Sequence, residues 1–186
     1  MEPWFPLRKS GCEAVMNLNL IISGLALTII IGLTSIAIGL VVGLTVGTLH
    51  SKFFGSGLIS KFLKAYVIWT KGAPLFVQLL LFYFGVPSLL GCNPSPLLVG
   101  ILTLGTYSGA YLSSIIRGSI DDVPESQWGA GKVLGYSRWQ TLRLIILPQA
   151  LVKAIPGLTN EFVACLQNSS LLMIIGVNEL TKIGRD

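Results

Sequence analysis

A long run without any charged residue lies near the start of this chain. No Asp, Glu, Lys or Arg occurs from Ala14 to Leu49. The stretch from Leu18 to Leu49 exceeds the ~20 residues that a helix needs to cross a bilayer, and it is too long for the apolar core of a signal peptide, about 7–15 residues. We therefore expect a retained membrane span.

The composition agrees with a membrane protein. Of the 186 residues, 52% are hydrophobic and only 11% are charged, against about 25% charged residues in soluble domains. The mean hydropathy is +0.75. These values exclude a soluble enzyme and predict an all-α, polytopic transmembrane helix bundle.

Three more apolar stretches make four expected spans. They lie near Pro74–Leu90, Leu97–Ile116 and Leu144–Leu166. The first is slightly short for a full span. Two prolines, Pro148 and Pro156, are expected to bend the last one.

Small residues recur in the first span at a spacing of four, as Gly39, Gly43 and Gly47. This spacing places them on one helix face, where a second backbone can approach closely. Two interpretations remain open: packing against another helix of the same chain, or a face for dimerisation.

The net charge of +5 comes from basic residues beside the spans, which is the pattern of cytoplasmic loops. No basic run with interleaved aromatic residues suggests nucleic acid. The loop expected between the first two spans holds four lysines and no acid: Lys52, Lys61, Lys64 and Lys71. We therefore expect residues 1–17 to form a non-cytoplasmic tail and residues 18–186 to form the transmembrane domain.

The longest polar interlude, residues 118–143, is expected to be a second cytoplasmic loop. Its sequence predicts two short helices joined at Gly135, because helices commonly end at a glycine in the left-handed conformation. Ser137 and Gln140 have the spacing of a capping box. An apolar side consists of Trp128, Val133, Leu134 and Trp139. This side predicts docking into a groove of a soluble partner; the alternative is an amphipathic loop on the lipid surface.

The last expected span carries Glu161, preceded by Asn160. An acid within a span is costly, so it usually faces a bundle interior or a wet cavity. A structural partner for Glu161 and contact with a substrate both remain open. The third span is unusually polar and includes Ser108, which either bonds within the bundle or lines a polar path. No spacing of the three cysteines fits a metal site.

Three stretches carry a resemblance to a known family. Lys71–Leu79, followed by Tyr83-Phe84, is similar to the motif RGTPLLVQL…YF, and Ala110–Gly118 is similar to AYxAExxRG. The polar loop is similar to the EAA loop, EAA-x3-G-x9-I-x-LP. The matching positions are Gly129, Ala130, Gly131, Gly135, Ile145, Leu147 and Pro148. The chain thus resembles the permease subunits of ABC importers for polar amino acids.

The resemblance implies an ABC importer type-1 transmembrane domain in the bacterial inner membrane. The EAA loop would couple it to a cytoplasmic ABC ATPase dimer. Further implied partners are a second permease subunit, identical or different, and an extracytoplasmic amino-acid-binding protein. No GxxxxGK[ST] nucleotide motif occurs here, and no cofactor is expected. Glu161, Asn160 and Ser108 are the expected substrate-binding residues.

The chain departs from the family pattern at several positions. Gly129 replaces the motif glutamate, Gly131 replaces its second alanine, and Ser114 replaces the glutamate of the third span. Each glycine costs up to ~1 kcal/mol of helix stability relative to alanine. We also expect the family's last span to be missing.

These departures favour an alternative, a truncated or degenerate permease that acts only in assembly or does not transport. A secondary transporter or channel is disfavoured because no inverted repeat is visible.

Overall fold

The computed structural model describes residues 11–54 and 57–185, with side chains from Leu18 onward, and the regular structure in that part is entirely helical. Three helices are long and apolar enough to cross a membrane: Leu18–Leu49 with 32 residues, Pro96–Asp121 with 26 and Arg138–Ile175 with 38. The predicted all-α membrane bundle is confirmed. Of the expected N-terminal tail, residues 1–10 lie outside the described residues, whereas residues 11–17 already belong to the first helix.

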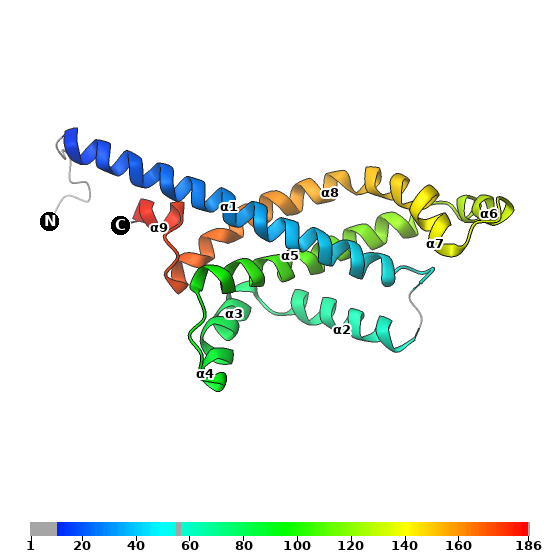
Figure 1. Cartoon of the computed structure of the whole chain (residues 1–186), viewed down its shortest axis with the longest axis horizontal. Coiled ribbons are helices and arrows are strands. Elements are labelled where there is room, and N and C mark those ends of the chain that lie inside the picture. The colour runs from blue at the N-terminus through cyan, green and yellow to red at the C-terminus, as the bar shows by residue number, and fades with distance from the viewer. Residues whose placement is uncertain (1–10, 55–56, 186) are drawn as a thin grey trace.

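Helix α1 (Gly11–Leu49) packs most extensively on α5 (Pro96–Asp121) (Figure 1). A methyl group at Gly43 would lie 2.6 Å from Cβ of Leu112, and one at Gly47 would lie 2.7 Å from the carbonyl oxygen of Ser113. The glycine face of α1 is therefore in contact with α5. The interpretation as packing within the chain is confirmed.

The segment after α1 differs from the expected basic loop. Helix α2 (Leu58–Gly72) runs back along α5, and Tyr66 Oη donates a hydrogen bond to the carbonyl of Thr106. The chain then bends by 105° before the next helices. Lys71 is thus part of a helix that lies against the bundle, and its assignment to a loop was wrong.

The expected span Pro74–Leu90 is not one regular helix. It consists of α3 (Leu75–Leu80), a π-helical turn at Leu81–Gly85 and α4 (Val86–Leu90). Together with α2 it makes a broken span or a re-entrant element. The break has a local cause, because the residue before a proline avoids the helical conformation, and Ala73 is extended at φ −100° and ψ 135°.

Gln78 bridges this break. Its Nε2 donates hydrogen bonds to the carbonyl oxygens of Thr70 at 2.8 Å and Ala73 at 2.9 Å. Helix ends leave such carbonyls without intrahelical partners, and the Gln78 amide supplies partners where α2 stops.

Helix α8 (Leu147–Asn168) returns along α5 and is curved (Figure 1). A π-helical turn at Leu142–Ile146 leads into it. Pro148 lies two residues after this turn, and a proline interrupts the regular hydrogen-bond ladder of the preceding turn. The chain continues through a 3-10 helix at Ser169–Ile175 to α9 (Leu180–Arg185), which lies against α1.

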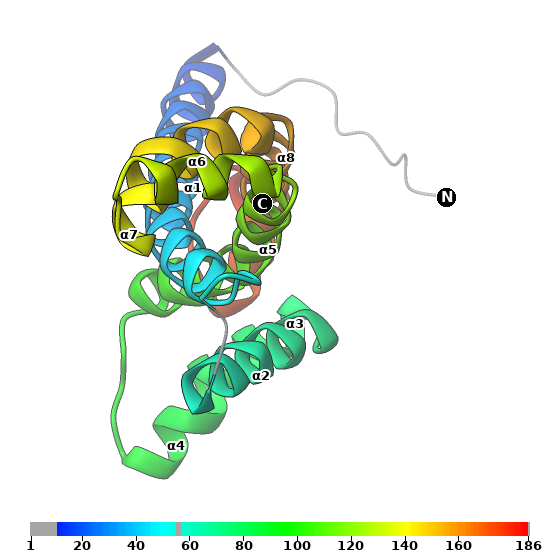
Figure 2. The ribbon, with the colours of Figure 1, turned by 90° about the vertical axis from the view of Figure 1, so that its right-hand side faces the viewer.

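Two short helices cross one end of the bundle. They are α6 (Glu125–Val133) and α7 (Arg138–Thr141), and they lie beyond the ends of α1, α5 and α8 (Figures 1 and 2). Beneath them, a buried cluster joins α5 to the start of α8, and Trp128 packs against it. Its buried members are Ile116, Ile120, Val123, Leu142, Ile146 and Ala150. The polar loop is thus anchored to two spans.

Valine at position 43 should destabilise the bundle, because its side chain would overlap Leu112. Overpacking of this kind costs about 1–3 kcal/mol. The midpoint of thermal unfolding in detergent measures the effect. Ala37→Val, at an exposed position of the same helix, is the control and should leave the midpoint nearly unchanged. Equal midpoints for the two variants would contradict the packing of α1 on α5.

Candidate functional site

A buried carboxyl group lies at the contact between α8 and α5. Glu161 of α8 is only 8% exposed, and Ser108 of α5 is 1% exposed. The Ser108 hydroxyl makes no hydrogen bond of standard geometry with any described residue, although Glu161 and Cys165 lie near enough to interact with it. The structure thus brings together two of the three residues predicted to bind substrate.

A cation from α2 completes this cluster. Lys71 Nζ donates a hydrogen bond to Ser114 Oγ at 2.7 Å and lies 4.7 Å from the centroid of the Tyr111 ring. The ammonium group also attracts the carboxyl group of Glu161. The Tyr111 and Tyr107 hydroxyls are 3.1 Å apart. Sequence reasoning missed Lys71 as a site residue, although the proline at position 74 signals that a helix ends beside it.

Asn160 does not join the cluster. It is exposed, whereas its neighbour Glu161 is buried. Consecutive residues of a helix point about 100° apart, because one turn takes 3.6 residues. The two side chains therefore lie on different faces of α8.

The cluster combines opposite charges with hydroxyl groups in a small region of the bundle. A carboxylate that accepts and an ammonium group that donates match a ligand that carries both charges. Within the residues that the structure covers, no group of three or more His, Cys, Asp or Glu side chains is placed to hold a metal ion.

The polar loop has the helix ends that the sequence predicts. Gly135 has φ +75°, and the Tyr136 N–H donates to the carbonyl of Gly131 at 2.9 Å. Ser137 and Gln140 form the reciprocal capping box, with bonds of 2.8 and 3.3 Å. Both predictions, the left-handed stop and the capping box, are confirmed.

The two glycines at the EAA positions have different surroundings. A methyl group at Gly129 would meet open space, and the neighbouring Ala130 is exposed. A methyl group at Gly131 would overlap the side chain of Thr141 and lie 2.9 Å from its Cβ. Gly131 therefore allows α6 and α7 to pack closely, whereas Gly129 faces open space.

The remaining predicted coupling residues lie at the base of the loop. Ile145 and Leu147 pack against the buried cluster that joins α5 to α8. Pro148 is exposed in the first turn of α8. In this structure they connect the loop to its span, whereas the exposed apolar surface is formed by other residues: Val133, Leu134, Tyr136 and Trp139.

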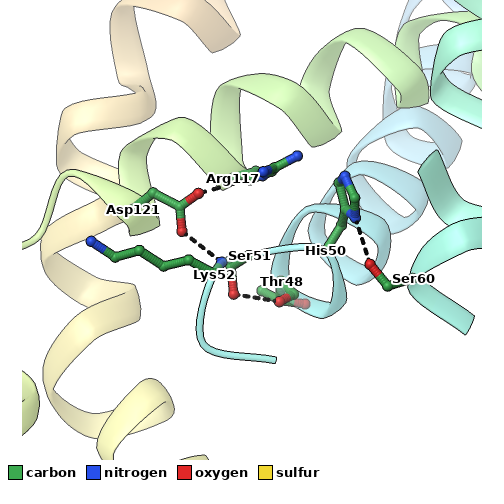
Figure 3. Close-up of polar contacts among 7 residues, drawn as sticks. All are labelled: Thr48, His50, Ser51, Lys52, Ser60, Arg117 and Asp121. Carbon is green, nitrogen blue, oxygen red and sulfur yellow. Dashed lines mark hydrogen bonds and ion pairs between the residues drawn. The ribbon is translucent and has the colours of Figure 1, made fainter. Parts of the chain in front are cut away.

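A polar network ties the chain after α1 to the end of α5 (Figure 3). Asp121 accepts hydrogen bonds from the Lys52 N–H at 2.9 Å and from Arg117 Nε at 3.4 Å. His50 Nδ1 is 3.0 Å from Ser60 Oγ. Burial lowers the pKa of His50, and the charges of Arg117 and Lys64 lower it further against an opposing effect of Asp121.

The comparisons with known proteins place the chain in a family. A family model described as the inner membrane component of binding-protein-dependent transport systems matches residues 35–185. The chain belongs to this family. That assignment fits the long apolar helices and confirms the expected inner-membrane location.

Individual relatives are similar along most of the chain. The glutamine transport system permease protein GlnP of Escherichia coli (strain K12) is 33% identical over 168 residues, which cover 90% of this chain and 76% of the relative. The probable amino-acid ABC transporter permease protein YckA of Bacillus subtilis (strain 168) is 34% identical, covering 90% and 73%. A crystal structure of an amino acid ABC transporter with histidines matches with a TM-score of 0.81 and 31% identity, covering 95% of this chain and 81% of that one.

Alanine substitutions should separate the roles of the two glycines. Gly129→Ala should stabilise α6 by about 0.5–1 kcal/mol, because alanine is the better helix former and its methyl group meets open space. Gly131→Ala should destabilise the loop, because the methyl group overlaps Thr141. Hydrogen exchange of the α6 amides in lipid nanodiscs measures both effects. Slower exchange in both variants would contradict the close packing at Gly131.

Proposed function

We propose that this chain is the permease subunit of an ATP-driven importer that moves a polar amino acid across the cytoplasmic membrane. The family assignment supports a transport role, and the relatives named for glutamine and amino-acid transport support the substrate class. The observation that carries the proposal is a buried carboxyl group, Glu161, which interacts electrostatically with the Lys71 ammonium group inside a membrane bundle.

Every α-amino acid carries an ammonium and a carboxylate group on neighbouring atoms. In our proposal Glu161 accepts hydrogen bonds from the ammonium group and Lys71 binds the carboxylate. Charged hydrogen bonds of this kind are stronger than neutral ones. Ser108, whose hydroxyl has no standard partner within the described residues, supplies a further polar contact.

Transport then needs partners outside this chain. We infer a second permease subunit, a cytoplasmic ATPase dimer and an extracytoplasmic amino-acid-binding protein. The two helices that cross the end of the bundle dock on the ATPase, which performs the ATP hydrolysis. The buried cluster anchors these two helices to α5 and α8. This anchoring supports the role, because a rigid connection is needed to transmit a movement of the ATPase to the membrane helices.

The variant Glu161→Gln should reduce amino-acid uptake into proteoliposomes at least tenfold, since a hydrogen bond to a charged group contributes about 1.5–3 kcal/mol and ~1.4 kcal/mol corresponds to a factor of ten. Co-purification with the ATPase should persist, because the side chain keeps its size. Thr159→Val, at an exposed position on the same helix, is the matched control. Normal uptake by the glutamine variant would exclude the role of Glu161.

Proline at position 135 should separate ATP hydrolysis from transport. Proline fixes φ near −65° and has no N–H, whereas Gly135 has φ +75° and donates to the Lys132 carbonyl at 3.0 Å. The ratio of amino acid transported to ATP hydrolysed in proteoliposomes measures the coupling. Gly118→Ala, where a methyl group meets open space, should keep the ratio. An unchanged ratio in Gly135→Pro would refute the coupling role of this hinge.

A further inference from the structure

A groove opens beside the two short helices at the end of the bundle. Its volume is about 470 Å³, and it lies between α6, α7 and the chain that follows α1. The rings of Phe53 and Trp128 stack in its lining, with centroids 4.0 Å apart and an angle of 25° between their planes. The groove therefore has an aromatic wall at the end of the molecule that carries the polar loop.

The other lining residues make the groove basic. Lys132 and Arg138 line it, and neither side chain has an ion pair or hydrogen bond with a described residue. Glu125 is the one acid of the lining, and it lies 4.0 Å from Lys52 Nζ on the surface. Three cations thus face one carboxylate, and two of the cations lack a partner in the described part of the chain.

Gly129 leaves the space in which a matching acid would lie. It lines the groove and has no atom within 4 Å of the position of a Cβ. The similar EAA motif has a glutamate at this position. A glutamate here would stand three residues before Lys132, a spacing that brings two helix side chains together. Without it, the groove is open and its positive charge remains uncompensated.

The groove is held in shape by contacts on each side. The Lys52 backbone is tied to Asp121 at the end of α5 (Figure 3). The left-handed Gly135 and the Ser137 capping box fix the turn between α6 and α7. A preformed site loses less conformational entropy when it binds a partner.

Exposed apolar side chains lie on the same loop as the residues that line the groove. Val133 is 89% exposed, Leu134 is 64% exposed and Trp139 is 56% exposed. A loop that carries both exposed apolar side chains and a basic groove fits a protein surface with an acidic side chain, and aromatic anchors are typical centres of such interfaces. A lipid headgroup would match the charge as well, and the composition of the membrane distinguishes the two ligands.

We propose that the groove receives an aspartate or glutamate side chain of the cytoplasmic ATPase subunit, which binds between Lys132 and Arg138. This inference rests on the proposed function, because it needs an ATPase partner. The permease supplies the cations of the contact and the ATPase supplies the anion.

Charge-matched variants at position 129 test the proposal in purified permease complexes in nanodiscs. Gly129→Glu places a carboxylate in the groove, and Gly129→Gln places a neutral side chain of the same size there. The affinity for the ATPase that co-purifies with the wild-type chain should be about tenfold lower for the glutamate variant than for the glutamine variant, as expected for like charges at an interface. Equal affinities would overturn the proposal.

Crosslinking identifies the partner directly. A carbodiimide joins a lysine amine to a carboxyl group in contact with it, so Lys132 should form a bond to an Asp or Glu of the ATPase, detected by mass spectrometry. Lys132→Arg should lose this crosslink and bind the ATPase better than Lys132→Glu, because it keeps the charge. A Lys132 crosslink that maps only within the permease would overturn the proposal.

The nanodisc composition separates the partner from a lipid. If the groove binds the ATPase, the charge effect at position 129 persists when anionic phospholipid is replaced by phosphatidylcholine. Loss of the effect in neutral nanodiscs would assign the groove to a lipid headgroup and overturn the proposal. A wild-type chain that binds no ATPase in either membrane would overturn the proposed function as well, so the two failures are distinct.

Discussion

The close approach of α1 and α5 determines where the other elements lie. Between helices in lipid the hydrophobic effect is weak, so small residues that allow tight packing carry much of the association. The glycine face of α1 provides this contact, and α5 uses its other sides to hold α2, α3 and α8. As a result, α5 places Ser108 and Ser114 beside Glu161 and Lys71, and places Asp121 beside the chain that forms the groove.

The features that the sequence predicted correctly depend on residues that are close together in the chain. The capping box at Ser137 and the positive φ of Gly135 involve atoms within one helical turn, so the residue types alone specify them. The first span was equally clear, because its length and composition leave few alternatives. The helical nature of α2 and the position of Lys71 were not predicted. The position of Lys71 depends on contacts with α5 about 40 residues further along the chain.

Gly129 and Gly131 show the limit of sequence reasoning most clearly. Both were expected to loosen the same helix by removing a side chain. In the structure the first faces a groove and the second contacts Thr141. The difference arises from the fold of the loop, which brings Thr141 back over α6 ten residues later. The residue type therefore predicted the loss of helix stability at both positions, but it predicted the contacts of neither glycine.

A lysine lies near each of the two positions where the chain lacks a glutamate of the family motifs. Ser114 stands in place of one, and Lys71 donates to its hydroxyl without losing its charge. Gly129 stands in place of the other, and Lys132 lines the groove there without an ion pair among the described residues. In the proposed transporter, Lys71 binds an amino-acid carboxylate at the first site, and Lys132 binds an acidic side chain of the ATPase at the second. A cation without a partner is costly to bury in an interface. Lys132 therefore favours a partner surface that brings an anion, and the missing carboxylate at position 129 is replaced by one from outside the chain.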